Sequence, residues 1–233
     1  MDCAAAIRLN PANVKAHYRS ASALLALNKI AEALDMVSRG LELDPSNKAL
    51  KRLEESVQAR QGANEKDGVL RAAEQQKKQA IRMTLAAALR ARNVKLRGSR
   101  QALDLEDAEI HLSPDPTNPR SVLVFPAVLL YPMHAKSDFV KHFAENDSIM
   151  DHLRYILPLP WDCEHEYQIQ SISCYMDTTS RGMVKIGKKV SLLEALATGA
   201  TEVVDGLVRI HVVPAALTEQ WIRKVKRRKG GEG

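Results

Sequence analysis

The chain has 233 residues, of which 45% are hydrophobic and 27% charged, and this composition is typical of a folded globular protein rather than a disordered one. Its 11 glycines, 10 prolines and 3 cysteines exclude collagen-like and disulfide-scaffold classes, and no apolar stretch approaches the roughly 18–20 residues that cross a bilayer. The net charge is +9 over residues 1–100, −8 over 101–222 and +5 over 223–233, so the total of +6 belongs to no single region.

These changes of sign and of pattern predict three parts. We expect a partial repeat region over residues 1–45, a basic helical connector over 46–100, and a C-terminal domain over 101–233 that ends in a basic tail. The fold class predicted is α+β: α-hairpin repeat, long connecting helix, then a mixed, twisted β-sheet surrounded by helices.

A repeat begins close to the N-terminus. Residues 7–13 read IRLNPAN and residues 41–47 read LELDPSN, which places Pro11 and Pro45 34 residues apart. This interval is the period of the tetratricopeptide (TPR) repeat, a helix-turn-helix unit.

The interval itself reads as two helices, over residues 13–27 and 30–43, with Asn13 as the N-cap of the first. Small residues fall where packed helices of this repeat need them, at Ala21, Ala33 and Gly40. Before it, only one helix fits, over residues 2–9, and it looks like the second half of a preceding repeat. Because such units need neighbours for stability, we expect the sequence to be part of a longer protein.

Lys15 and Arg19 lie four residues apart on the first of these helices and therefore share one face. Two cations on a helical surface suit a terminal carboxylate and an acidic side chain, through charge-assisted hydrogen bonds. The alternative is a solvated basic helix face. Spacing alone does not decide between them.

The connector is predicted to be helical from Ser46, its candidate N-cap, to about residue 97, either as one long helix, since no proline intervenes, or as a helix broken near Gly62 and Gly68. It carries 13 Lys+Arg and 5 Asp+Glu. A solvated spacer is the favoured interpretation; contact with RNA or ribosomal phosphates is the alternative. An apolar stripe begins it, at Leu50, Leu53 and Val57.

The C-terminal domain opens with a proline-rich linker over residues 113–119. The apolar run 121–131 predicts a strand whose Pro126 requires an edge position or a bulge. Further strands are expected over 167–176, 183–186 and 207–213.

Helices are expected between these strands. Asp138 is read as the cap of a helix that begins at 139–143 and resumes through 149–155, Ser191 opens a capping box, and residues 217–228 form a terminal amphipathic helix.

Signatures of catalysis and of cofactor binding are missing from the sequence. Cys163, His165 and Cys174 contain zinc-type ligands but lack the paired spacing of structural zinc. His134 and His142 are interpreted as surface histidines, and no nucleophile, phosphate-loop or dinucleotide fingerprint occurs. We therefore expect a non-enzyme without metal or cofactor.

The chain has few aromatic residues on which bases could stack, which argues against a nucleic-acid partner. The basic segment 223–229 fits nuclear targeting, nucleic-acid contact or a solvated helix end equally well. Three sparse cysteines and an N-terminus without a signal peptide predict the cytosol or nucleus, with no membrane partner.

Several short segments, taken in their order along the chain, resemble one known family. The family is tetratricopeptide repeat protein 4, which includes the fungal "cyclophilin seven suppressor" co-chaperone. The resemblance covers nearly the whole chain and rests on residues 7–13, 15–19, 89–94, 128–132, 137–139, 159–162, 184–189 and 203–207.

This resemblance implies a co-chaperone whose TPR domain binds the acidic C-termini of heat-shock proteins 90 and 70. Lys15 and Arg19 match the Lys and Arg of the third repeat's carboxylate clamp. The clamp's other residues belong to two earlier repeats with no counterpart here, so we expect weak or absent peptide binding by this chain. The C-terminal "wheel" domain would assist client maturation, with elongation factor 2 as the implied client. A ribosome- or RNA-associated basic scaffold is the alternative function.

Overall fold

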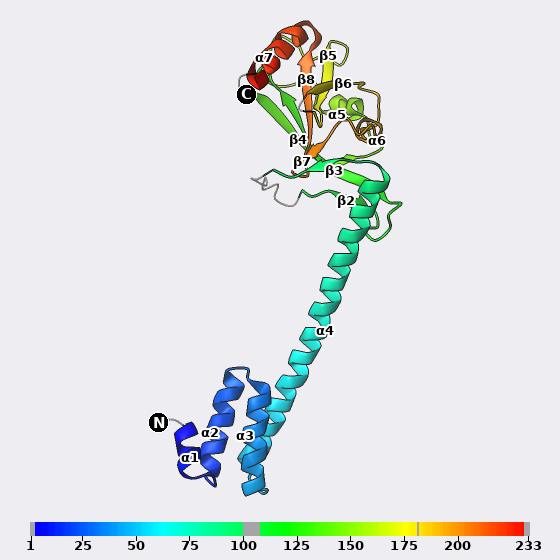
Figure 1. Cartoon of the computed structure of the whole chain (residues 1–233). Helices are drawn as coiled ribbons and strands as arrows, with labels where there is room; N and C mark the ends of the chain where they lie inside the picture. Colours follow the sequence, from blue (N-terminus) through cyan, green and yellow to red (C-terminus); the bar gives the residue numbers. More distant parts are fainter. Residues whose placement is uncertain (1–2, 100–107, 181, 231–233) are drawn as a thin grey trace. The chain divides into compact units, whose positions relative to one another are not determined.

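The computed structural model describes residues 3–99, 108–180 and 182–230, and these form two units, residues 1–78 and 79–233 (Figure 1). The first unit is helical and the second is built on a sheet. The expected connector over 46–100 is thus divided between the two units.

The first unit contains three short helices and the beginning of a long one: α1 (Cys3–Leu9), α2 (Val14–Ala26), α3 (Ile30–Leu43) and α4 (Lys48–Ala91). Asn13 caps α2 as predicted, because its side chain accepts a hydrogen bond from the Ala16 N–H at 3.1 Å. The cap of α4 is Asn47 and not Ser46: the Asn47 Oδ1 accepts from the N–H groups of Ala49 and Leu50, both at 3.1 Å.

Helices α2, α3 and α4 approach each other closely around the predicted small residues. Ala21 and Ala33 are fully buried. A Cβ atom on Gly40 would lie 2.8 Å from Leu50 Cδ1 and 3.3 Å from His17 Cβ, so a larger residue here would require the Leu50 side chain to shift. The sequence prediction of packed TPR helices is therefore confirmed residue by residue.

The single long helix is confirmed, and the alternative of a break near Gly62 and Gly68 is wrong, since α4 continues through both glycines. The central part of α4 is exposed; Val69, for example, is 69% exposed. Packing occurs towards the two ends, through Leu50, Leu53 and Val57 in the first unit and through Leu85, Ala88 and Leu89 in the second. Each glycine destabilises a helix by only about 1 kcal/mol relative to alanine. Helical turns already formed on both sides of the two glycines favour continuation of the helix through them, because extending a helix is easier than starting a new one.

The second unit contains a six-stranded mixed sheet (Figure 1). β3 makes the most pairings: it is antiparallel to β4 along one edge, and along its other edge it is antiparallel to β2 and parallel to β8. The path β2-β3-β8-β5-β6 consists of His111–Ser113, Val122–Tyr131, Val208–Pro214, Ile172–Asp177 and Met183–Ile186, and β4 is Lys136–Ala144.

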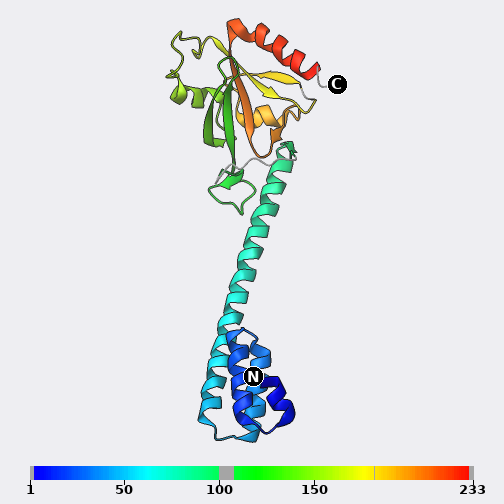
Figure 2. The ribbon, with the colours of Figure 1, turned by 90° about the vertical axis from the view of Figure 1, so that its left-hand side faces the viewer.

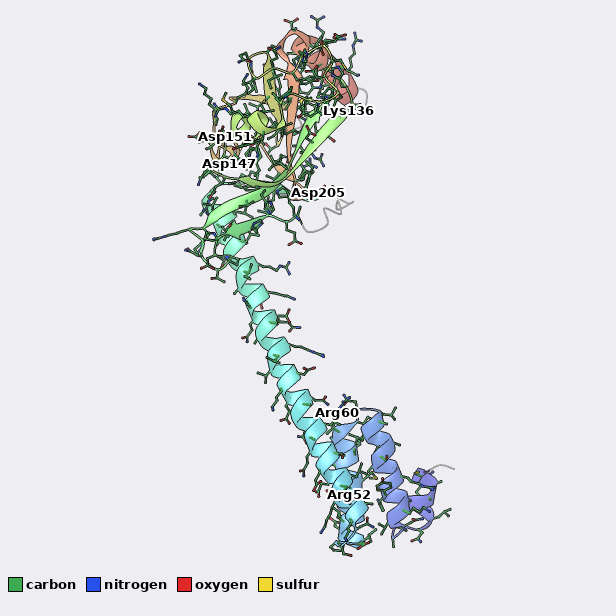
Figure 3. The ribbon with its side chains drawn as sticks, turned by 180° about the vertical axis from the view of Figure 1, so that it is seen from behind. Arg52, Arg60, Lys136, Asp147, Asp151 and Asp205 are labelled. Carbon is green, nitrogen blue, oxygen red and sulfur yellow. The ribbon has the colours of Figure 1, made fainter. Side chains whose placement is uncertain are left out.

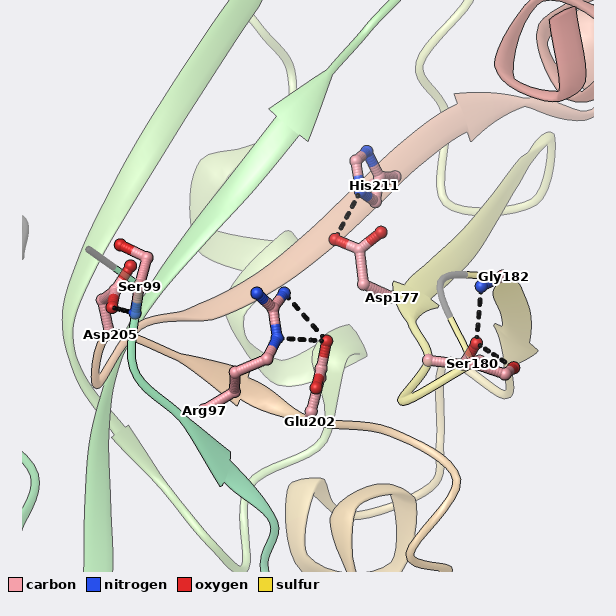
Figure 4. Close-up of polar contacts among 9 residues, drawn as sticks. Arg97, Ser99, Asp177, Ser180, Gly182, Glu202, Asp205 and His211 are labelled. Atoms are coloured by element: carbon pink, nitrogen blue, oxygen red, sulfur yellow. Dashed lines mark hydrogen bonds and ion pairs between the residues drawn. The ribbon is translucent and has the colours of Figure 1, made fainter. Parts of the chain in front are cut away.

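A separate pair of short parallel strands, β1 (Leu96–Arg97) and β7 (Val203–Val204), joins the segment after α4 to the sheet domain. Arg97 pairs with Glu202 at 3.0 Å beside it (Figure 4). The helix expected to reach residue 97 therefore ends earlier, at Ala91. Two residues later, Asn93 adopts a φ of 55°, which is outside the range of a right-handed helix.

Helices cover both faces of the sheet. Along β5, Cys174 and Met176 join the core that contains Leu153 of α5 (Ile149–Ile156) and Leu196 of α6 (Leu192–Ala197). Tyr175 points to the opposite face, where it contacts Trp221 of α7 (Thr218–Gly230), which follows the short turn η1 (Ala215–Leu217). This alternation is the period-2 pattern of a strand buried on both faces.

The bulge and the capping box expected in this domain are confirmed. Pro126 lies at a register shift between Phe125 and Ala127, which is the bulge that its missing N–H requires. Ser191 forms a capping box with Glu194, as expected. A second capping box, which was not predicted, joins Ser148 to Asp151 (labelled in Figure 3), and the Ser148 hydroxyl lowers the pKa of the Asp151 carboxyl.

Others are wrong. Residues 113–119 are the turn of the β2–β3 hairpin rather than a linker. Residues 139–143 belong to strand β4, not to a helix capped by Asp138, so His142 lies in a strand. The helix expected to resume over 149–155 is present as α5, Ile149–Ile156, whereas β5 begins at Ile172 rather than at 167.

Among the described residues, no helix is both long enough and apolar enough to cross a membrane.

Candidate peptide-binding site

Lys15 and Arg19 lie on the exposed face of α2, as their spacing predicted, together with Tyr18. The opposite face of the helix buries Ala16, His17 and Ala21. The start of α2 is held in place by His17, whose Nε2 lies 3.0 Å from the Pro11 carbonyl oxygen. A rigid helix thus presents both cations side by side, with Cβ atoms about 5–6 Å apart.

The electrostatic surroundings of this pair favour an anion. Residues 3–31 contain no Asp or Glu, and within the described chain neither Lys15 nor Arg19 forms a side-chain hydrogen bond or an ion pair. By contrast, Lys29 and Arg39 of the same unit are paired with Glu32 at 3.2 Å and Asp35 at 3.1 Å. The α2 face therefore offers two uncompensated cations to a carboxylate.

The candidate zinc ligands are not brought together. Cys163 is exposed, Cys174 is buried in β5, and the described residues contain no group of three or more potential ligands. Burial raises the pKa of the Cys174 thiol to about 12, whereas zinc binds the thiolate.

This difference predicts selective alkylation. We expect iodoacetamide at neutral pH to modify Cys163 in the folded chain and to leave Cys174 unmodified, because Cys174 is both inaccessible and protonated. Peptide mass spectrometry of the labelled protein checks this, and adding denaturing urea should make Cys174 react. Equal labelling of the two thiols without urea would contradict the buried environment of β5.

Sequence reasoning missed a cluster of aromatic and acidic side chains in the second unit. His134, read as an isolated surface histidine, lies 5.2 Å from Trp161 between ring centroids, and its Nε2 is 3.6 Å from Glu166 Oε2. The only sequence signal was the segment Leu159-Pro160-Trp161-Asp162, because a tryptophan is rare in this chain. His134 comes from a turn 27 residues earlier in the sequence than Trp161.

Comparison with known proteins assigns both units. A profile described as "Tetratricopeptide repeat" matches residues 2–57, and one described as "Cns1/TTC4 Wheel domain" matches residues 115–225. The class of protein is therefore a TPR unit combined with a Wheel domain.

Relatives of known name share this arrangement. The chain is 34% identical to the Hsp70/Hsp90 co-chaperone cns1 of Schizosaccharomyces pombe over 98% of this chain and 64% of that protein. It is 30% identical to tetratricopeptide repeat protein 4 of Mus musculus over 84% of this chain and 55% of that one. The chain belongs to the Cns1/TTC4 family, as the sequence resemblance indicated.

A solved structure supports the fold. The Hsp90 co-chaperone Cns1 from Saccharomyces cerevisiae (delta69) matches with a TM-score of 0.82 and 25% identity, covering 97% of this chain and 75% of that one. The chain spans less than two thirds of the length of the two fungal co-chaperones it matches, at 64% and 62%.

Proposed function

We propose that the chain acts as a co-chaperone of heat-shock proteins 90 and 70, binding their acidic C-terminal peptides on the α2 face of its TPR unit. The observation that carries this proposal is the exposed, unpaired couple of Lys15 and Arg19 on one rigid helix in a segment without acidic residues. The names of the fungal relatives, which are Hsp70/Hsp90 co-chaperones, support the choice of partner.

In this role Lys15 and Arg19 hold the terminal carboxylate and a neighbouring acidic side chain, and no covalent step is involved. The Wheel domain assists the maturation of client proteins, and the family resemblance makes elongation factor 2, and hence translation, the proposed client link. We place the protein in the cytoplasm, with the basic segment 223–229 as a candidate nuclear-targeting signal.

Removing either cation is expected to weaken binding of an acidic peptide about tenfold or more, because each forms a charge-assisted hydrogen bond. The probe is a pentapeptide ending in aspartate with a free carboxylate, and its C-terminal amide is the matched ligand. We expect the wild-type chain to bind the acid in preference to the amide, Lys15→Ala and Arg19→Ala each to reduce that preference, and the double variant to abolish it. Nuclear magnetic resonance titration measures this even at weak affinity.

Arg39→Ala is the matched control, since it removes a charge of the same sign from the same unit but from a side chain already paired with Asp35. Peptide binding that is unchanged in the Lys15→Ala, Arg19→Ala double variant would refute the site. A micromolar dissociation constant for the wild-type chain would refute the expectation that a partial clamp binds the peptide only weakly.

The alternative, a basic RNA-associated scaffold, is weakened by what the cations of the connector contact. Four of them are paired with carboxylates: Arg71 with Asp67, Lys78 with Glu74, Arg92 with Glu145 and Arg97 with Glu202. Phosphate binding by the remainder would fall steeply with added salt, so a salt titration of RNA binding separates this function from peptide binding.

A further inference from the structure

The Wheel domain contains a small pocket that the proposed chaperone contacts do not use. It has a volume of about 220 Å³ and lies between the turn after β3 and the loop that follows α5. This is below the 300–1,000 Å³ typical of sites for cofactors or drug-sized ligands, so it suits one long side chain. Its lining consists of His134, Trp161, Asp162, Cys163, Glu164 and Glu166.

The aromatic wall of the pocket is rigid. The Trp161 ring contacts Tyr131 and Tyr167 edge-on, with ring centroids 5.2 and 5.3 Å apart. Tyr131 is fully buried and donates its hydroxyl to Asp138 Oδ2 at 2.8 Å, and Tyr167 OH lies 3.1 Å from His134 Nδ1. Trp161 itself is only partly buried, and its remaining surface lines the pocket. An indole fixed in this way attracts cations to its face.

The carboxylates of the loop have two different tasks. Asp162 is buried and is already satisfied, because its two oxygens accept the backbone N–H groups of Glu166 at 3.0 Å and Tyr167 at 2.8 Å. These two hydrogen bonds tie the end of the loop, at Glu166 and Tyr167, to Asp162 near its start. Glu164, which is exposed, forms no side-chain hydrogen bond or ion pair with the described residues, and Glu166 meets only the imidazole of His134 at 3.6 Å.

The charge of the lining therefore selects the ligand. Three carboxylates and no lysine or arginine line the pocket, so an anion is repelled and an apolar group would desolvate the carboxylates without compensation. A metal ion is not favoured, since no three potential ligands converge among the described residues. An arginine fits: its guanidinium stacks on an indole and donates to carboxylates in a fork.

We infer that this pocket, the Trp161 pocket, binds an arginine side chain presented by a partner polypeptide. The α2 face would take an acidic chain end, and the Trp161 pocket a basic segment. The two sites are in different units, and the inference does not depend on the chaperone contact.

The probe is acetyl-Gly-Gly-Arg-Gly-Gly-amide, and its matched ligand has citrulline in place of arginine, which keeps the planar shape but removes the charge. The chain has 2 tryptophans, Trp161 and Trp221, so the indole N–H resonances of the ¹⁵N-labelled full chain report the site directly. We expect the arginine peptide to shift the Trp161 resonance saturably and citrulline to bind about tenfold more weakly, as loss of a charge-assisted contact implies.

The variant Glu164→Gln, Glu166→Gln is expected to reduce arginine-peptide binding about tenfold, and Glu109→Gln, Glu219→Gln, which removes two exposed charges elsewhere in the unit, to leave it unchanged. The unperturbed Trp221 resonance verifies folding. Equal binding of citrulline and arginine peptides, or no saturable shift of Trp161, overturns the inference without any variant.

A second readout uses the exposed thiol in the pocket lining, because bound arginine peptide should slow the alkylation of Cys163. Unchanged alkylation at saturating peptide would count against the site. The chaperone proposal is tested separately: Lys15→Ala, Arg19→Ala should lose acidic-peptide binding and retain the Trp161 response, so either proposal can fail alone.

Discussion

Replacing Arg92 by methionine should destabilise the Wheel domain by about 3–5 kcal/mol, because it leaves the carboxylate of Glu145 buried without a counter-charge. The Arg92 Nε lies 2.6 Å from Glu145 Oε2, and the two side chains are 17% and 5% exposed. Arg92 also donates to the carbonyl oxygens of Pro119 at 3.0 Å and Ser121 at 2.8 Å. One guanidinium therefore ties the end of α4 to the β2–β3 hairpin and to the residue after β4.

Urea unfolding followed by tryptophan fluorescence measures this effect, since both tryptophans lie in the second unit. The matched control is the double variant Arg92→Met, Glu145→Gln, which removes the buried charge as well and should recover part of the loss. Glu145 Oε1 also accepts the Leu123 N–H at 3.0 Å, a bond that the glutamine oxygen can keep. A loss below about 1 kcal/mol in Arg92→Met would show that Glu145 is solvated.

The TPR unit could be predicted from the sequence because its determinants are local. The 34-residue spacing of Pro11 and Pro45, the cap at Asn13 and the small residue at Gly40 each act within one hairpin. Helix boundaries at 14–26 and 30–43 follow from these contacts and agree with the prediction. The spacing of Lys15 and Arg19 could likewise be placed on one face.

The sheet was harder because strand pairing is non-local. Phe139 and Phe143 are four residues apart and mimic a helical stripe, but Phe139 pairs with Val128 and Phe143 with Phe125 in β3. These ladder bonds determine the conformation of the segment, and local propensity cannot show them. The turn signal at 113–119 was detected, but nothing in it distinguishes a hairpin turn from a linker between domains.

The Trp161 pocket could not be predicted for the same reason. His134 and Glu166 are 32 residues apart in sequence, and each is unremarkable alone. They meet because Tyr131, at the end of β3, packs against Tyr167, which places the β3–β4 turn beside the loop after α5. Only the packing of two buried rings, not a motif, brings the polar groups together.

Replacing Trp221 by alanine is the second substitution with a large expected effect, about 3–5 kcal/mol, because the indole fastens α7 to the sheet. Trp221 is 3% exposed, and its ring lies 5.2 Å from Tyr175 and 5.4 Å from His211. The rest of the contact is smaller: Ile222 and Val225 are only partly buried against it. Losing the ring would open this face to water, including the His211–Asp177 pair at 3.5 Å (Figure 4).

Two measurements distinguish undocking of α7 from general damage to the domain. Urea unfolding gives the loss of stability, and limited trypsin digestion of the native protein should cut the variant at Arg223 and Lys224 much faster than the wild type. Trp221→Phe keeps an aromatic ring and should lose less than half as much stability (Figure 2 shows α7 in red). If Trp221→Ala retained wild-type resistance to trypsin, α7 would be held by the partly buried residues instead, and the basic segment would be fixed independently of the indole.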